Sequence, residues 1–293
     1  MLLSADQFLD FVCVAAPRAG TTWLFEALRE HPAVYVPPAK ELNFFNEPFL
    51  SHLEFKYARG IAYYRRQFES APPDAILGEL TPTYYVDPGA ADRIYRHFPG
   101  VKIICLLRHP VEVVFSTYLK ALAYLPLAPT FRAALETNPE LIELGYYHKY
   151  LSRYCERFPK TRIYVRTYEA FFADAVQECA ALYRFLGVDD TFRPTVLGRR
   201  INTRKEVRWP AAVRFRHGLQ TALNHRATLP IKRWLTRSNA LAALDKRLAE
   251  SNLREAALPT LDEQTRLWLM EKVANDIGRL ERLFDIELDV WKR

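Results

Sequence analysis

The stretch that decides the fold is Phe11-Val-Cys-Val-Ala-Ala-Pro-Arg-Ala-Gly-Thr-Thr-Trp-Leu24. Its first six residues, 11–16, form a continuous apolar run, which predicts a strand buried on both faces of a parallel sheet. The apolar residues after Thr22 recur at helical spacing, so a tight turn around Gly20 joins the strand to a helix. Several backbone N–H groups and the positive helix end then meet at one point, an arrangement that holds phosphate or sulfate.

Strand-like apolar runs alternate with helical patterns up to Gly187. This alternation predicts an α/β fold, with a P-loop-like parallel sheet flanked by helices. The expected strands are 11–16, 34–36, 75–79, 101–107 and 162–166, and the expected helices are 57–69, 88–97, 110–123, 147–158 and 169–186.

Only helices are expected after Gly187. The last one is predicted to begin at a capping box, Thr260–Glu263, and to form a helical C-terminal cover. We expect a single domain over 1–293, with a basic helical insertion of unassigned role at 209–256. The apolar stripe of the last helix is predicted to pack on the sheet through Leu267, Met270, Val273, Ile277, Leu280 and Phe284.

The composition is that of a globular protein, with 49% apolar and 26% charged residues. No run approaches the roughly 18 apolar residues that a membrane-spanning helix needs. The first ten residues contain two acids and no basic residue, so we expect no secretory signal and a cytoplasmic location. No metal site is expected, and the cysteines, without CxxC spacing, are expected to be buried reduced thiols: Cys13, Cys105, Cys155 and Cys179.

The net charge of +7 is unevenly distributed. The segment 198–237 contains eleven Lys or Arg residues and one acid, Glu206, so it contributes +10 and the rest of the chain −3. A local basic field favours an anionic ligand, a polyanion or a membrane surface, and a solvated basic face is the alternative. Because the segment also carries Phe215 and Trp234, we expect it to line an acceptor entrance or to hold the protein peripherally at an anionic membrane.

The turn after the first strand has the residues that an anion site needs. Gly20 permits close approach of the backbone, Thr21 and Thr22 add hydroxyl donors, and Arg18 adds a charge. The nucleotide-kinase form of the loop, GxxxxGK[ST], is absent because Ala15 replaces its first Gly and Thr21 its Lys. The loop is therefore predicted to bind an anion other than the β,γ-phosphates of ATP with magnesium.

A second anion site is predicted where the run 101–107 ends. Arg108 follows the strand directly, at the sheet edge where open α/β sheets bind ligands. Ser116 and Lys120 share one face of the following helix, because they are four residues apart. Arg, Ser and Lys converging on one point are expected to hold a second anionic group, and a strand-end salt bridge of Arg108 is the alternative.

These motifs resemble those of the PAPS-dependent sulfotransferase family, in its bacterial and glycosaminoglycan-type branch, whose donor is 3′-phosphoadenosine 5′-phosphosulfate (PAPS). Residues 17–24 are similar to the loop for the 5′-phosphosulfate, and Arg108 and Ser116 to the 3′-phosphate site. Lys40-Glu-Leu-Asn-Phe-Phe45 and Gly78-Glu-Leu-Thr-Pro-Thr-Tyr84 resemble two further segments of that branch. The resemblance covers about 11–206 and 260–291, and it implies PAPS as co-substrate without a metal. Together with Lys120 from the helix spacing and Arg204 as a candidate from the basic segment, the predicted nucleotide site comprises Arg18, Ala19, Gly20, Thr21, Thr22, Trp23, Arg108, Ser116, Lys120 and Arg204.

The sequence departs from the family pattern in three places. Arg18 stands where the loop often has Lys, which keeps the charge and changes its geometry. The family's Glu-Lys-Thr-Pro (EKTP) segment corresponds to 79–82 here, and Leu80 replaces its Lys, so one substrate or sulfonate contact is missing. Cytosolic sulfotransferases have a Lys/Arg-Gly loop late in the sequence that closes on PAPS, and no such loop is recognisable here. The candidates to replace it are Arg199, Arg200, Arg204 and Lys205.

Glu41 is the predicted general base, with Arg18 as the catalytic cation. An acceptor hydroxyl must lose its proton as the new S–O bond forms, and a carboxylate within hydrogen-bond reach can take it. The resemblance implies the same role, since the counterpart of Glu41 is the base in the glycosaminoglycan branch. A purely structural pairing of Glu41 with Arg18 or Lys40 is the alternative, and Glu79 is the rival carboxylate.

The predicted reaction is in-line transfer of a sulfuryl group from PAPS to an acceptor hydroxyl or amine. The expected partner is a small-molecule, glycan or lipid-linked acceptor rather than a nucleic acid. Two other functions stay open: a P-loop-type kinase of a small molecule, and a polyanion- or membrane-binding module on a vestigial nucleotide fold.

Overall fold

The structure is a computed structural model of the chain, and it describes residues 8–47, 55–122, 125, 127–198, 206–207, 253–254 and 261–292. The chain divides into two compact units. The first comprises Met1–Val113, Glu143–Ile201 and Leu269–Arg293, and the second comprises Val114–Ile142 and Asn202–Trp268. The single domain over 1–293 stays a prediction, and its basic insertion, 209–256, lies outside the described residues except for 253–254.

A five-stranded sheet forms the centre of the first unit, and every neighbouring pair of strands is parallel. The order β2-β3-β1-β4-β5 places the first strand in the middle, between β3 and β4. The predicted fold class is confirmed. The strands are β1 Phe11–Cys13, β2 Val34–Tyr35, β3 Ile76–Leu80, β4 Lys102–Leu107 and β5 Ile163–Thr167.

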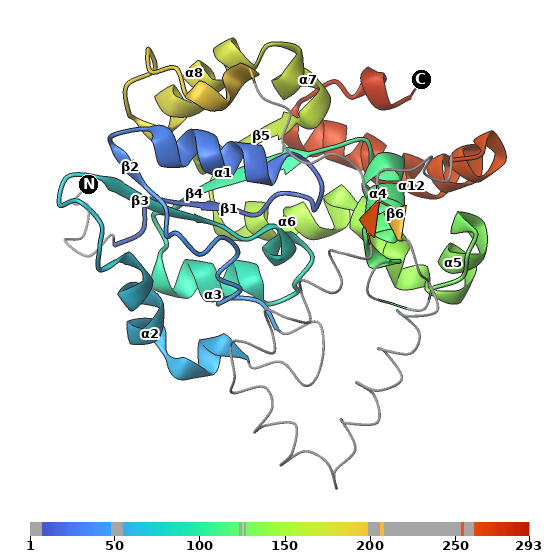
Figure 1. Cartoon of the computed structure of the whole chain (residues 1–293), viewed down its shortest axis with the longest axis horizontal. Helices are drawn as coiled ribbons and strands as arrows, with labels where there is room; N and C mark the ends of the chain where they lie inside the picture. Colours follow the sequence, from blue (N-terminus) through green and yellow to red (C-terminus); the bar gives the residue numbers. More distant parts are fainter. Residues whose placement is uncertain are drawn as a thin grey trace, which may run out of the picture. The chain divides into compact units, whose positions relative to one another are not determined.

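Helices cover both faces of this sheet. Figure 1 shows α1 and α8 on one face and α3 and α6 on the other. From β1 the chain first adds β2 and β3 on one side of β1, and it then crosses to add β4 and β5 on the other side. The strand order therefore reverses beside the carboxyl end of β1. Ligands of open α/β sheets bind at such a point. The helices of this unit are α1 Thr21–Glu30, α2 Ile61–Arg65, α3 Ala90–His97, α6 Tyr147–Arg157, α7 Tyr168–Ala173 and α8 Ala175–Leu186.

Two helices run from one unit into the other, α4 Pro110–Ala121 and α12 Glu263–Phe284. After α12 the chain ends in a short 3₁₀ helix, Asp289–Trp291, whose Trp291 is fully buried. The indole Nε1 of Trp291 donates to Glu169 Oε2 at 3.0 Å, and Glu169 Oε1 accepts from the backbone N–H of His109 at 2.9 Å. The C-terminal cover is thus attached to the end of β4.

In the described part of the second unit, α5 Phe131–Thr137 is a helix that the sequence did not predict. Thr130 caps it by accepting from the N–H of Ala133. The ring of Phe131 packs at 5.0 Å from that of Phe115, which fixes α5 against the second half of α4. Within this unit β6 Glu206–Val207 and β7 Leu253–Arg254 pair antiparallel, so the expectation of helices only after Gly187 is wrong.

Two predicted helices are interrupted in the structure. The stretch 57–69 breaks at Gly60, whose φ of 78° is outside the helical region, into short helical pieces on either side. The stretch 169–186 breaks at Asp174, whose φ is −142° and whose side chain caps α8 by accepting from the N–H of Gln177. In both places a local backbone conformation overrides the helical pattern of the side chains.

The last helix begins differently from the prediction. Asp262 caps α12 by accepting from the N–H of Thr265 at 2.8 Å, and Glu263 is its first residue, so the predicted capping box is wrong. Leu267 of the predicted stripe is 61% exposed, and Leu269 is buried instead. The four cysteines are free thiols, with Cys155 half-buried and the others buried. Among the described residues no helix is long and apolar enough to cross a membrane.

Candidate active site

The turn between β1 and α1 lies at the carboxyl end of the central strand. Backbone hydrogen bonds from Val14 N to Ile104 O and from Ala16 N to Leu106 O, both 2.9 Å, extend the pairing with β4 up to the turn. Arg18 and Gly20 then take left-handed conformations, with φ of 66° and 83°. A positive φ is uncommon for a residue other than glycine and often marks a functional site, because surrounding contacts must hold it.

Gly20 is required at this turn for two reasons. Its φ suits glycine, and a Cβ there would lie 2.8 Å from Cε2 of Phe172, whose ring packs against the turn. Within the described chain no side chain caps the N-terminus of α1, and its first turn contains no acidic residue. The first N–H groups of α1 therefore suit an anion, as the sequence predicts.

Lys40 brings a cation to this turn from the segment after β2. Its Nζ lies 3.4 Å from the hydroxyl of Thr21, 3.3 Å from that of Thr22 and 2.9 Å from Oε1 of Glu41. The side chain of Lys40 is 20% exposed and that of Glu41 is 45% exposed. The predicted base thus lies beside the predicted anion loop, and Lys40 contacts both.

The backbone around Glu41 is held by the end of β3. The N–H of Glu41 donates to Leu80 O at 3.1 Å, and the Nδ2 of Asn43 donates to Glu41 O at 2.7 Å. Glu41 and Asn43 both have left-handed φ values, 62° and 50°. In an extended strand consecutive side chains point to opposite faces, so the turn at Glu41 is what lets Lys40 and Glu41 meet.

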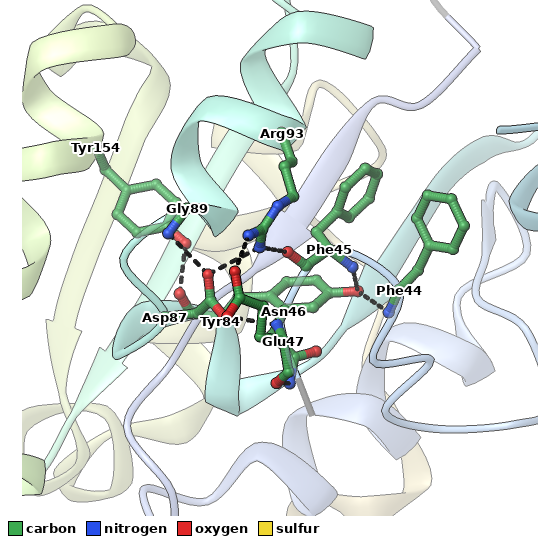
Figure 2. A network of polar contacts seen from close by, with 9 residues as sticks. All are labelled: Phe44, Phe45, Asn46, Glu47, Tyr84, Asp87, Gly89, Arg93 and Tyr154. Carbon is green, nitrogen blue, oxygen red and sulfur yellow. Dashed lines mark hydrogen bonds and ion pairs between the residues drawn. The ribbon is translucent and has the colours of Figure 1, made fainter. Parts of the chain in front are cut away.

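A polar network fixes the segment that follows Glu41 (Figure 2). The hydroxyl of Tyr84 accepts from the N–H groups of Phe44 and Phe45, at 2.9 and 3.3 Å. Asp87 accepts from the N–H of Glu47 at 2.7 Å and pairs with Arg93, which also donates to Phe45 O. The rings of Phe44 and Phe45 are buried, so apolar packing and these hydrogen bonds fix the segment together.

Glu79, the rival carboxylate, is enclosed in the core. It is 1% exposed; Oε1 accepts from the hydroxyls of Tyr64 and Tyr84, and Oε2 accepts from Thr81, each at 2.9 Å. Burial raises the pKa of Glu79 to about 7, although these hydrogen bonds act in the opposite direction. Both oxygens of Glu79 are thus occupied by donors inside the core, so its side chain supports the fold.

Arg108 lies at the end of β4, beside the same turn. Its guanidinium donates to the backbone O of Arg18 at 3.2 Å, pairs with Glu112 at 3.3 Å and stacks over the ring of Tyr168 at 5.0 Å. The hydroxyl of Tyr147 donates to the backbone O of Arg108 at 2.6 Å. The strand-end salt bridge that was the alternative for Arg108 is therefore present, and the guanidinium is also oriented at the sheet edge.

The other predicted nucleotide residues occupy different surroundings. Ser116 and Lys120 lie on α4 in the second unit, Ser116 buried and Lys120 exposed. The indole of Trp23 is in the core, where its Nε1 donates to Val196 O at 3.0 Å, so only the backbone of Trp23 can face a ligand. Ala19 is buried at the turn. Arg199, Arg200, Arg204 and Lys205 lie outside the described residues.

A pocket of about 420 Å³ lies elsewhere in the first unit, between α6 and α12. Asp276 lines this pocket. Its carboxylate accepts from the N–H groups of His148 and Lys149 and so binds the first turn of α6. The pocket includes none of the predicted site residues. Among the described residues no group of three His, Cys, Asp or Glu side chains could hold a metal ion.

Part of the chain is similar to known sulfotransferases. Residues 73–192 match the profile of the sulfotransferase family. Heparan sulfate glucosamine 3-O-sulfotransferase 6 of Homo sapiens is 29% identical over 190 residues, which are 62% of this chain and 53% of that protein. Over these residues the chain is similar to members of the sulfotransferase family.

Other sulfotransferases extend this comparison. The membrane-associated sulfotransferase kil1 of Dictyostelium discoideum is 31% identical over 143 residues, 46% of this chain and 29% of that protein. The crystal structure of a sulfotransferase from Alicyclobacillus acidocaldarius has a TM-score of 0.70 at 24% identity, covering 97% of this chain and 99% of that one. This last likeness concerns the fold. The chain spans about half the length of the first curated relatives.

These similarities confirm the predicted resemblance to sulfotransferases, and the structure adds residues that the sequence did not assign. The sequence indicates Lys40 only as a pairing partner of Glu41, and the structure also places its Nζ at the loop hydroxyls. Tyr168 packs between Gly20 and Arg108. A lysine directly before the predicted base was a usable signal for Lys40, whereas nothing in the sequence linked Tyr168 to the turn.

Proposed function

We propose that this chain transfers a sulfuryl group from PAPS to a hydroxyl of a carbohydrate acceptor. The observation that carries the proposal is the convergence of the uncapped α1 turn, Lys40 and Glu41 at the carboxyl end of β1. The names of the relatives support the choice of acceptor, since several are heparan sulfate glucosamine 3-O-sulfotransferases. A turn that offers N–H groups and a neighbouring carboxylate suits both an anionic donor and a proton to be removed.

The proposed transfer is an in-line displacement at sulfur. The acceptor oxygen forms a new bond to sulfur as the bond between sulfur and the bridging phosphate oxygen breaks. The departing oxygen keeps the bonding electron pair, which gives 3′-phosphoadenosine 5′-phosphate (PAP). The carboxylate of Glu41 takes the proton of the acceptor hydroxyl. Positioning and charge stabilisation provide most of the acceleration in a displacement of this type.

The roles of the cations follow from their places. Arg18 and the N–H groups of residues 20–22 are proposed to stabilise the charge that grows on the departing phosphate oxygen. Arg108, already oriented by Tyr147 and Tyr168, is proposed to bind the 3′-phosphate together with Ser116 and Lys120. Binding then requires Arg108 to exchange its pairing with Glu112 for the phosphate.

One binding experiment separates the proposed function from the two alternatives. Isothermal titration calorimetry of the full chain compares PAP, AMP, ATP with magnesium, and heparin. A sulfotransferase should bind PAP at micromolar concentration and AMP much more weakly, because AMP lacks the 3′-phosphate. Preference for ATP with magnesium would favour a kinase, and binding of heparin alone would favour a polyanion-binding module.

The acceptor entrance and the location in the cell stay predictions. The basic segment 198–237 is proposed to attract an acidic acceptor or an anionic membrane surface, through charges that salt would screen. Its Arg204, or its neighbours Arg199 and Lys205, are the proposed replacements for the late nucleotide loop. The cytoplasmic location and the lack of a nucleic-acid partner rest on the sequence alone.

A further inference from the structure

Lys40 lies between the turn that would bind the leaving phosphate and the carboxylate of Glu41, the proposed base. Its Nζ contacts the hydroxyls of Thr21 and Thr22, at the turn where the leaving phosphate would bind. The same nitrogen contacts Oε1 of Glu41, where the acceptor proton would go. In an in-line displacement the sulfur atom lies between the leaving oxygen and the attacking oxygen. A cation placed between the turn and the base is therefore beside the group in transit.

Two positions near this place lack a lysine that related motifs have there. Thr21 stands where the nucleotide-kinase loop has Lys, and Leu80 stands where the EKTP segment has Lys. Leu80 is 2% exposed, so its side chain takes part in the core instead. The backbone O of Leu80 accepts from the N–H of Glu41, the residue next to Lys40. The segment that is hydrogen-bonded to Leu80 therefore has a lysine, Lys40, next to the bonded residue.

The contacts of Lys40 are suited to binding an anion rather than to holding the fold. Both of its loop partners are neutral hydroxyls at 3.3 and 3.4 Å, which is long for hydrogen bonds. Its ion pair with Glu41 joins adjacent residues and is partly exposed, and such pairs contribute little to stability. Another lysine does hold this segment, because Lys56 Nζ donates to Leu42 O at 2.6 Å.

We propose that Lys40 binds the sulfuryl group of PAPS and stabilises its charge during transfer, in place of the lysine missing at Leu80. This inference rests on the proposed function and assigns one residue within it. An ammonium group there acts on the sulfuryl oxygens, which PAPS has and PAP lacks. Removing Lys40 should therefore affect PAPS and its turnover much more than PAP.

The test compares Lys40→Ala and Lys40→Arg with the wild-type chain. Lys40→Ala should lower kcat/KM for PAPS by roughly 10²–10³, the usual loss for one charge-stabilising donor. Its Kd for PAP, from calorimetry, should change much less, by under about fivefold, because PAP lacks the sulfuryl oxygens that Lys40 is proposed to bind and a partly exposed charge contributes little elsewhere. Lys40→Arg keeps the charge and should recover at least about tenfold of the lost kcat/KM. A merely structural role would lower PAPS and PAP binding together.

Lys56→Ala is the matched control, since it removes a lysine that holds the same segment without contacting the turn. It should lower the Tm while leaving the ratio of KM for PAPS to Kd for PAP unchanged. Equal losses for PAPS and PAP in Lys40→Ala, or the same pattern in Lys56→Ala, would overturn the assignment of Lys40. The proposed function fails separately, if the wild-type chain neither binds PAP nor turns over PAPS.

Discussion

Two carboxylates stand near the carboxyl ends of neighbouring strands, and their surroundings differ in almost every respect. Glu41, after β2, is 45% exposed, sits on a left-handed turn and pairs with Lys40. Glu79, within β3, is 1% exposed and accepts hydrogen bonds from Tyr64, Tyr84 and Thr81. The two regions touch, because the N–H of Glu41 donates to the O of Leu80.

The difference shows how one carboxylate supports the other. Glu79 orients Tyr84, whose hydroxyl in turn accepts from the N–H groups of Phe44 and Phe45 just beyond Glu41. A buried acid with several donors costs free energy to bury but fixes the geometry around it. An exposed acid beside a cation can approach a substrate. Position along a strand therefore does not assign a role; burial and partners do.

The largest expected effect is on turnover. Glu41→Gln should lower kcat by roughly 10²–10⁴, because an amide cannot take the acceptor proton, while the Kd for PAP stays near the wild-type value. Glu79→Gln, assayed in parallel by steady-state kinetics, should retain kcat within about tenfold of the folded wild type, because Glu79 does not contact the acceptor. The reverse pattern would move the base role to Glu79 and reverse the comparison.

The next effect is on stability and concerns Glu79. Because burial raises its folded pKa to about 7 from 4.5, the folded state keeps a proton that the unfolded state releases as the pH rises through this range. Its contribution to the unfolding free energy therefore falls with rising pH, by about 2–3 kcal/mol between about pH 5 and 8. The side chain in Glu79→Gln cannot ionise, so the unfolding free energy of the variant should not show this loss. Between about pH 5 and 8, urea denaturation should therefore show the variant becoming more stable relative to the wild type by this amount. A difference independent of pH would contradict the assignment.

Arg108 extends the comparison to a cation whose carboxylate partner can be exchanged. Arg108→Ala should weaken PAP binding by roughly 10–100-fold, the loss expected for hydrogen bonds to a charged group, and AMP binding far less. Calorimetry with both nucleotides measures the two losses. Equal losses would mean that Arg108 only holds the turn through Arg18 and Tyr168.

The smallest effect tests the support around Glu79. Tyr64→Phe removes one donor to Oε1 of Glu79 and leaves Tyr84 in place. Unfolding free energy should fall by about 1 kcal/mol, the net contribution of one hydrogen bond, with kcat little changed. Thermal denaturation together with kinetics gives both values. A large loss of kcat at unchanged stability would show that this region does more than support the fold.

Much of the fold could be predicted because parallel buried strands leave clear apolar runs. The run 101–107 became β4, Lys102–Leu107, and 75–79 became β3 with a shift of one residue. Local backbone choices could not be predicted in the same way. The sequence pattern is helical through Asp174, whose side chain nevertheless caps a new helix. At the start of α12 the capping residue is Asp262, because several polar residues compete for that place.

The site was predictable where a motif lies within one stretch of chain. Arg18, Gly20 and Glu41 were singled out from their neighbours in the sequence, and the structure places them around one sheet edge. The role of Lys40 depends on a left-handed turn at Glu41 and on a contact across about twenty residues, which no periodicity encodes. The enclosure of Glu79 depends on Tyr64, from a different segment, and also could not be seen.

The central claim, sulfuryl transfer from PAPS, is tested most directly by following the group itself. PAPS labelled with sulfur-35 is incubated with the full wild-type chain in two separate reactions. One contains a desulfated heparan-type glycan as acceptor, and the other contains a simple phenol. The account predicts labelled glycan, one PAP released for each sulfate transferred, and loss of the label in Glu41→Gln. Labelled phenol with unlabelled glycan would confirm sulfuryl transfer from PAPS but would show that the acceptor is a phenol and not a carbohydrate. No labelled product from either acceptor, with the label leaving only as inorganic sulfate or staying in PAPS, would contradict the account.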